Sequence, residues 1–222
     1  GKIPKQAVAI MDKAGHIEKY INNPIIDGAP VDMTGEIRDP FVFRKDEKYY
    51  MLLGAKSKKE KGALLLYTSE DLLKWDYMGE ISLPIDTGYM LECPSFIEVD
   101  GKDVMILSPM GLEKEELKYQ NQFSTLYLVG KLDIENMKFD LEYMDEVDSG
   151  FDFYASQAFY GKGNKPMMVS WFGCGEQDLP TDKEMWKHGL TMPHDLKLVE
   201  NRLCKFVSEE LNNLFNDKNE FS

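Results

Sequence analysis

The sequence predicts an all-β fold, a β-propeller whose blades are four-stranded sheets. The 222-residue chain contains many short strand-like segments and little helical pattern. A strand–turn–strand pattern recurs roughly every fifty to sixty residues, a period at which repeats indicate propeller blades. Each copy of the pattern begins with a polar or acidic element, which points to a shared site.

The first copy follows an Arg-Asp-Pro element at residues 38–40. Residues 41–43 and 49–53 are expected to form a hairpin across a polar turn. Two further strands are expected at residues 62–69 and 75–81, and they complete a four-stranded blade.

Two more copies follow along the chain. The strand expected at residues 93–99 leads through an Asp-Gly-Lys turn into a strand at 104–107. A weaker copy runs from residues 155–159 into residues 167–171. We interpret residues 1–211 as one propeller segment, and residues 212–222 as a polar tail that frays.

The leading elements of the three copies are Arg-Asp-Pro at 38–40, Glu-Cys-Pro at 92–94 and Asp-Phe-Tyr at 152–154. In a propeller, the first strand of each blade lies nearest to the central axis, so these elements are expected to converge on one cavity. Each element alone has an ordinary explanation, because Asp-Pro is a common turn and a loop acid is often solvated. Their equivalent places in a repeat favour a common site.

The net charge indicates which kinds of binding partner to expect, and the cysteines indicate the cellular compartment. A net charge of −13 argues against nucleic acid or an anionic membrane as the main partner. The three cysteines and three histidines show no metal-ligand spacing, so we expect neither a metal nor a cofactor. Reduced thiols and a beginning unlike a secretory signal are typical of a cytoplasmic protein.

Three motifs follow one another along the chain: Arg-Asp-Pro at 38–40, Glu-Cys-Pro at 92–94 and Gly-Phe-Asp-Phe-Tyr-Ala at 150–155. In this order they resemble glycoside hydrolase family 32, the invertases and bacterial sucrose-6-phosphate hydrolases. The resemblance covers nearly the whole chain. It implies a five-bladed β-propeller whose funnel-shaped site binds a β-fructofuranosyl unit of a small carbohydrate substrate.

The resemblance also implies roles for single residues in a reaction that retains configuration. Glu92 corresponds to the general acid/base that protonates the glycosidic oxygen, and Asp39 corresponds to the transition-state stabiliser. Both types suit glycoside cleavage through a transition state resembling an oxocarbenium ion. For Trp171, stacking on a sugar and packing in the core are equally good readings. The expected substrate-binding residues are Arg38, Cys93, Asp152, Tyr154 and Trp171.

One departure from the family concerns the nucleophile. Family members carry it in an Asn-Asp-Pro motif upstream of Arg-Asp-Pro, whereas the only Asp-Pro in this sequence is Asp39-Pro40. The resemblance therefore implies a propeller segment that lacks the first blade and the C-terminal β-sandwich of the family, and the chain alone is expected to be inactive. The alternative is a non-catalytic carbohydrate-binding remnant of such an enzyme. In either case, open sheet edges favour self-association or association with a missing fragment.

Smaller departures lie close to the motifs. Ser95 stands where the family usually has Asp, and Ser156 stands where it usually has Pro. His194-Asp195 replaces the usual Arg-Glu pair. The last change is expected to affect an ion pair, either at the rim of the site or in a contact between blades.

Overall fold

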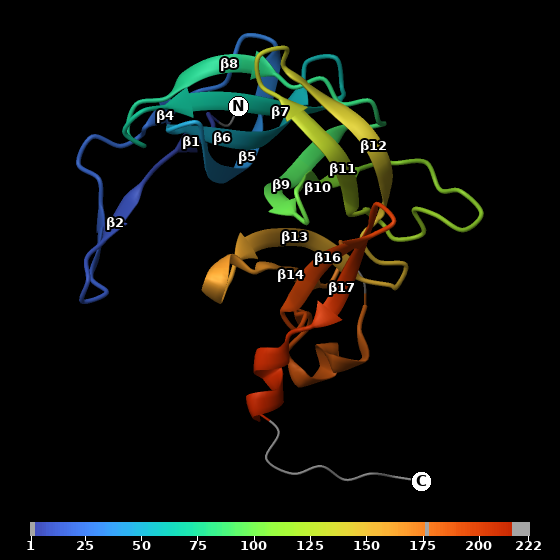
Figure 1. Cartoon of the computed structure of the whole chain (residues 1–222). Coiled ribbons are helices and arrows are strands. Elements are labelled where there is room, and N and C mark those ends of the chain that lie inside the picture. The colour runs from blue at the N-terminus through green and yellow to red at the C-terminus, as the bar shows by residue number, and fades with distance from the viewer. Residues whose placement is uncertain (1–2, 176–177, 215–222) are drawn as a thin grey trace, which may run out of the picture.

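The regular secondary structure of the described residues is mainly antiparallel β-sheet (Figure 1). This computed structural model describes residues 3–175 and 178–214. The all-β prediction is confirmed. No helix among these residues is long and apolar enough to cross a membrane. The expected tail, 212–222, extends beyond the described residues from 215 onwards, and a short 3-10 helix, Glu209–Leu214, crosses its expected start.

The first described residues form two small sheets. One pairs β1 (Lys5–Gln6) with β4 (Ile26–Asp27), and the other pairs β2 (Ala9–Met11) with β3 (Ile17–Lys19).

Three larger sheets follow in chain order, and within each one every strand pairs with the next strand of the path. The strands of the first sheet are β5 (Met33–Lys45), β6 (Lys48–Ser57), β7 (Gly62–Ser69) and β8 (Asp76–Glu80). Those of the second are β9 (Met90–Val99), β10 (Lys102–Met110), β11 (Leu126–Asp133) and β12 (Lys138–Glu146). Those of the third are β13 (Phe153–Tyr160), β14 (Pro166–Phe172), β16 (His194–Val199) and β17 (Arg202–Val207), with β15 (Gly189–Leu190) on β14.

Apolar clusters between the sheets hold them face to face. Leu52 and Leu64 of the first sheet belong to one cluster with Met105 of the second. Ile106, the next residue of β10, points to the other face and shares a cluster with Met168 of the third sheet. Full burial of one such side chain contributes about 1.5–3 kcal/mol. Blades of a propeller pack in this way, with each sheet covered on both faces by its neighbours.

The first strands of the three sheets lie side by side, because β9 contacts both β5 and β13. Each of these inner strands contains a bulge with one extra residue. The extra residue falls between Arg38 and Phe41, between Glu92 and Ser95, and between Tyr154 and Gln157. A left-handed residue occupies each bulge: Asp39 (φ 59°), Cys93 (φ 47°) and Ala155 (φ 53°). Bulges of this kind redirect side chains and are frequent beside functional sites.

The bulges correct two expectations. Arg-Asp-Pro at 38–40 was expected to precede its strand, but it lies inside β5, where the bulge accommodates Pro40. The third leading element was placed at 152–154, but the bulge shows that Tyr154-Ala155-Ser156 is the counterpart of Arg-Asp-Pro and Glu-Cys-Pro. Asp152 lies just before β13.

Ser95 and Ser156 take part in a buried polar contact between the second and third sheets. Ser95 Oγ accepts a hydrogen bond from the Ala158 N–H at 3.1 Å and lies 3.5 Å from the Ser156 carbonyl oxygen. The Ser156 and Ser170 hydroxyls are 2.7 Å apart. These serines therefore supply a hydrogen-bonded contact at positions where the family pattern has other residues.

We expect Ser95→Ala to lower the free energy of unfolding by about 1–3 kcal/mol, because it leaves the buried Ala158 N–H without an acceptor. The matched control is Ser149→Ala, at an exposed loop position, where a change within about 0.5 kcal/mol is expected. Equilibrium unfolding in urea measures both. Equal effects of the two substitutions would contradict the role of Ser95 in joining the sheets.

The His194-Asp195 pair lies within the third sheet. Asp195 on β16 pairs with Met167 on β14, and its carboxylate forms an ion pair with Lys165 Nζ at 2.8 Å. The change from the family pattern therefore affects an ion pair internal to one blade.

Candidate active site

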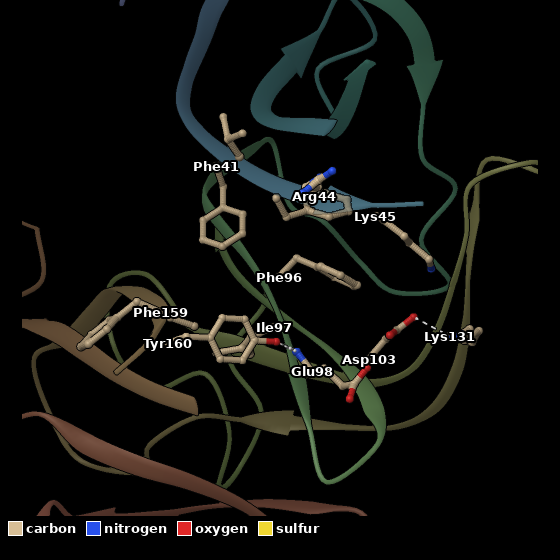
Figure 2. Close-up of a pocket in the computed structure, with 13 residues that line it drawn as sticks. Phe41, Arg44, Lys45, Phe96, Ile97, Glu98, Asp103, Lys131, Phe159 and Tyr160 are labelled. Carbon is tan, nitrogen blue, oxygen red and sulfur yellow. Dashed lines mark hydrogen bonds and ion pairs between the residues drawn. The ribbon is translucent and has the colours of Figure 1, made fainter. Parts of the chain in front are cut away.

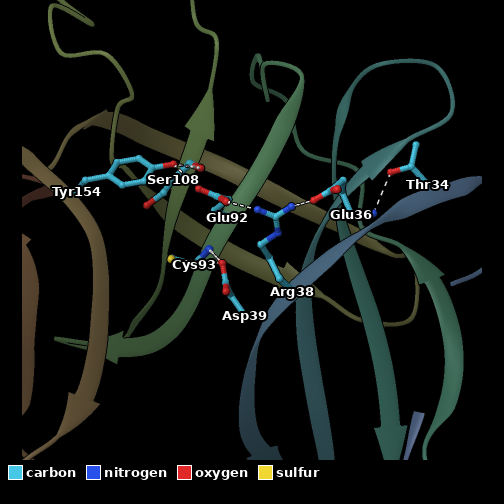
Figure 3. A network of polar contacts seen from close by, with 8 residues as sticks. All are labelled: Thr34, Glu36, Arg38, Asp39, Glu92, Cys93, Ser108 and Tyr154. Atoms are coloured by element: carbon cyan, nitrogen blue, oxygen red, sulfur yellow. Dashed lines mark hydrogen bonds and ion pairs between the residues drawn. The ribbon is translucent and has the colours of Figure 1, made fainter. Parts of the chain in front are cut away.

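The residue that opens each bulge contributes its side chain to one hydrogen-bonded network (Figure 3). Arg38 Nη1 donates to Glu92 Oε1 at 2.8 Å, and the Tyr154 hydroxyl donates to Glu92 Oε2 at 2.9 Å. Oε1 of Glu92 thus accepts from a cation of the first sheet, and Oε2 accepts from a hydroxyl of the third sheet. The fold brings together three residues that are far apart in the sequence.

Asp39 and Cys93 form a second contact beside this network. Asp39 Oδ2 accepts hydrogen bonds from the Cys93 backbone N–H at 2.9 Å and from Cys93 Sγ at 3.4 Å. Each strand therefore donates to a carboxylate of the other: Arg38 on β5 donates to Glu92 on β9, and Cys93 on β9 donates to Asp39 on β5. The two carboxylates that the sequence singles out therefore lie in one cluster, shown in Figure 3.

Glu36 belongs to the cluster although the sequence analysis did not select it. Its carboxylate forms an ion pair with Arg38 Nη2, so one guanidinium bridges two carboxylates. Glu36 and Arg38 are two positions apart on β5, and such residues generally share a face of a strand, which was an available signal. The Glu92 side chain is 16% exposed and that of Glu36 is 42% exposed. Arg38 therefore links a largely buried carboxylate to an exposed one.

Ser108 was also missed, because it contributes its backbone. The Tyr154 hydroxyl lies 3.2 Å from the Ser108 carbonyl oxygen. Ser108 pairs with Glu92 across the β9–β10 ladder, next to the bulge. A carbonyl group has no side-chain signature, so nothing in the sequence could have indicated this contact.

Burial raises the pKa values of the two neutral donors in the cluster. For Tyr154, the pKa is raised first by burial and then by the charge of Glu92 beside it. For the Cys93 thiol, the pKa is raised first by burial and then by the Asp39 carboxylate. Both groups therefore keep their hydrogens at ordinary pH and can donate them to the neighbouring carboxylates.

Trp171 and Asp152 lie at the edge of the network. The Trp171 ring meets the Tyr154 ring edge-on, with centroids 6.5 Å apart, and meets the His188 ring at 4.8 Å. The Asp152 Oδ1 atom is buried and has no hydrogen-bond partner among the described residues. Their expected roles in substrate binding stay predictions.

A pocket of about 610 Å³ lies further along the same inner strands (Figure 2). Phe41 of β5, Phe96 of β9 and Phe159 of β13 contribute to its walls, each beyond the bulge of its strand. The residues that line this pocket do not include Asp39 or Glu92. It is therefore a separate region from the carboxylate cluster.

The contact between Asp39 and Cys93 can be tested by thiol chemistry. We expect Asp39→Asn to accelerate alkylation of Cys93 by iodoacetamide at pH 8. The Asp39 carboxylate raises the pKa of the thiol, and the thiolate is the reactive form, so loss of the charge increases the thiolate fraction. Asparagine keeps an oxygen for the Cys93 N–H and tolerates a positive φ.

Mass spectrometry of the Cys93 peptide gives the rate, and the Cys204 peptide in the same digest is the internal control. An unchanged ratio of the two rates would contradict the contact.

Comparison with known proteins identifies the family of the chain. The sequence profile described as Glycosyl hydrolases family 32 N-terminal domain matches residues 1–208. The chain belongs to glycosyl hydrolase family 32. The matched region includes all three inner strands, so the whole carboxylate cluster lies within the family 32 domain.

Several known glycosidases are similar to the chain in sequence or in structure. The sucrose-6-phosphate hydrolase of Pediococcus pentosaceus is 38% identical over 201 residues, which are 89% of this chain and 40% of that protein. The structure of sucrose-6-phosphate hydrolase from Lactobacillus gasseri has a TM-score of 0.89 at 34% identity, covering 96% of this chain and 44% of that one. A family 32 β-fructofuranosidase of Bombyx mori has a TM-score of 0.86 at 31% identity, covering 95% and 45%. The chain spans less than half the length of each of these three proteins.

Proposed function

We propose that this chain is the acid/base-bearing portion of a β-fructofuranosidase that hydrolyses sucrose or sucrose 6-phosphate. The observation that carries the proposal is the cluster in which Arg38 and Tyr154 hold Glu92 while Cys93 holds Asp39. Membership of family 32 supports the reaction class. Similarity to a sucrose-6-phosphate hydrolase and to a β-fructofuranosidase supports the substrate class.

In the proposed reaction, Glu92 donates a proton to the glycosidic oxygen as the bond to the fructosyl carbon breaks. It then takes a proton from the water that completes hydrolysis, because an acid in the first step is a base in the second. Arg38 and Tyr154 support this role by fixing the orientation of the carboxyl group from both sides.

Asp39 stabilises the positive charge that develops on the fructosyl ring. A negatively charged group placed in advance lowers the barrier because it needs no rearrangement in the transition state. The Cys93 N–H and thiol occupy one oxygen of Asp39, which leaves the other for hydroxyl groups of the sugar. Arg38, Cys93, Tyr154, Trp171 and Asp152 complete the proposed substrate site.

We assign no nucleophile to this chain. Covalent retention requires a second carboxylate that attacks the anomeric carbon, and Asp39-Pro40 is the only Asp-Pro in the sequence. We propose a complete protein with a five-bladed propeller, of which this chain supplies the part without the first blade. Below, a protein that also carries an Asn-Asp-Pro segment upstream of this sequence is called the extended form.

Release of glucose from sucrose, and of glucose 6-phosphate from sucrose 6-phosphate, tests the proposed function. We expect turnover by the extended form and none by the 222-residue chain. Rapid hydrolysis by the chain alone would mean that another acid, such as Asp152, is the nucleophile. Sugar binding without turnover in both proteins would favour a non-catalytic carbohydrate-binding protein.

Two further features support the rest of the proposal. Phe172 on β14 and Leu190 on β15 are exposed apolar residues of the third sheet, suited to association with another copy or a missing fragment. Cys93 and Cys204 are free thiols, which supports a cytoplasmic location.

A further inference from the structure

The Tyr154 hydroxyl has two neighbouring acceptors but only one hydrogen to donate. Its oxygen lies 2.9 Å from Glu92 Oε2 and 3.2 Å from the Ser108 carbonyl oxygen. A carbonyl oxygen and an ionised carboxylate can only accept. When Glu92 is ionised, the Tyr154 hydrogen can therefore serve only one of these two neighbours, and the charged carboxylate is the stronger acceptor.

A protonated Glu92 changes this arrangement. The carboxylic acid can donate its own hydrogen to the Tyr154 oxygen, and the Tyr154 hydrogen can then turn to the Ser108 carbonyl. Every hydrogen then has an acceptor, and both distances in the structure suit hydrogen bonds. The two protonation states of Glu92 thus need no movement of heavy atoms, only rotation of one O–H bond.

Arg38 determines which oxygen of Glu92 carries the proton. Its Nη1 faces Oε1 at 2.8 Å, and a guanidinium group donates but cannot accept. A hydrogen on Oε1 pointing towards Arg38 would face another hydrogen. The proton therefore belongs on Oε2, the oxygen that faces Tyr154.

The charged and titratable groups around Glu92 are consistent with this assignment. Arg38 on β5 contacts Glu92, and Glu36 on the same strand contacts Arg38. Cys93 follows Glu92 in the sequence, and its N–H is hydrogen-bonded to the Asp39 carboxylate. Tyr154 contacts Glu92 from β13. Burial keeps the pKa of Tyr154 far above the ordinary pH range, so its hydroxyl retains its hydrogen throughout. Tyr154 is only 4% exposed, which limits competition from water.

We propose that Tyr154 is a positioning residue whose hydroxyl rotates between Glu92 Oε2 and the Ser108 carbonyl as Glu92 gains and loses its proton. The inference rests on the proposed acid/base function of Glu92. As Glu92 gives up this proton, the Oε2 hydrogen leaves the Tyr154 oxygen for the glycosidic oxygen. The Tyr154 hydrogen then turns from the Ser108 carbonyl to Oε2 and stabilises the new negative charge. When Glu92 later takes a proton from water, the hydroxyl turns back. The Tyr154 hydrogen stays on its own oxygen in both steps.

Carbon-13 NMR of the 222-residue chain tests this rotation without requiring turnover. The chain is labelled at tyrosine Cζ, at the glutamate carboxyl carbon and at the serine carbonyl carbon. The Tyr154 signal is the one that Tyr154→Phe removes. If that variant does not fold, contacts with the Phe123 ring, whose centroid is 5.7 Å from that of Tyr154, identify the signal instead.

We expect the Tyr154 Cζ and Ser108 carbonyl signals to shift with pH along a single sigmoidal curve, with the same midpoint as the Glu92 carboxyl signal. In Glu92→Gln both signals should stay near their low-pH positions, because the amide can also donate to the Tyr154 oxygen. Tyr127, a buried tyrosine that packs against Tyr143, is the internal control and should not follow this curve.

A Tyr154 signal that stays constant while Glu92 titrates would overturn the inference, as would an unchanged titration curve in Glu92→Gln. Because the experiment observes the hydroxyl rather than hydrolysis, such a failure leaves the proposed glycosidase activity standing. Conversely, an extended form without activity would refute the proposed function without altering these signals.

Discussion

Glu92→Gln in the extended form is expected to lower kcat on sucrose by about 10²–10⁴-fold, the usual contribution of a positioned general acid. Glutamine has nearly the same shape and can still accept from Arg38 Nη1, so the fold and sugar binding should change little. What is lost is the proton for the leaving glucose. Initial rates of glucose release measure the effect.

Two controls make the test of Glu92 specific. A fructoside with a good leaving group needs less protonation, so the first step on that substrate should suffer less. Glu98→Gln alters an exposed glutamate on the same strand, beside the separate pocket, and should leave kcat unchanged. Equal losses on both substrates would contradict the role of Glu92 as the acid.

Asp39→Asn in the extended form is expected to lower kcat by about 10²–10³-fold, by analogy with the loss of one preorganised stabilising group. The substitution removes the negative charge while keeping an acceptor for the Cys93 N–H. The main effect should fall on kcat rather than on KM, because the charge acts on the transition state.

The matched control is Asp46→Asn. Asp46 is another aspartate with a positive φ, 48°, but it is exposed at the turn between β5 and β6. Its replacement should leave activity unchanged. A loss of the same size in both variants would indicate backbone disturbance instead of charge.

The sequence predicted those parts of the fold that leave a recognisable residue pattern. Strand periodicity and the repeated motifs predicted the four-stranded sheets, and the motif order predicted that residues near 38 and 92 meet. The third motif was placed two residues too early because Asp152 resembles an acidic leading residue, whereas Ala155 gives no polar signal for the bulge.

The contacts that complete the cluster were beyond sequence reasoning for physical reasons. Pro40 suggested the start of a strand, but a bulge allows it inside β5. The carbonyl of Ser108 carries no residue-type information, and its place beside Tyr154 depends on the packing of the second sheet against the third. Of these contacts, only that of Glu36 could have been predicted from the sequence, because Glu36 lies two residues from Arg38 on the same strand.

The most direct test of the proposed site is a crystal structure of the extended Glu92→Gln protein with sucrose bound. We expect the fructosyl hydroxyls within hydrogen-bond distance of Asp39, and the glycosidic oxygen beside the side chain of residue 92. Sucrose bound instead in the pocket between Phe96 and Phe159, or with its fructosyl ring away from Asp39, would contradict the site.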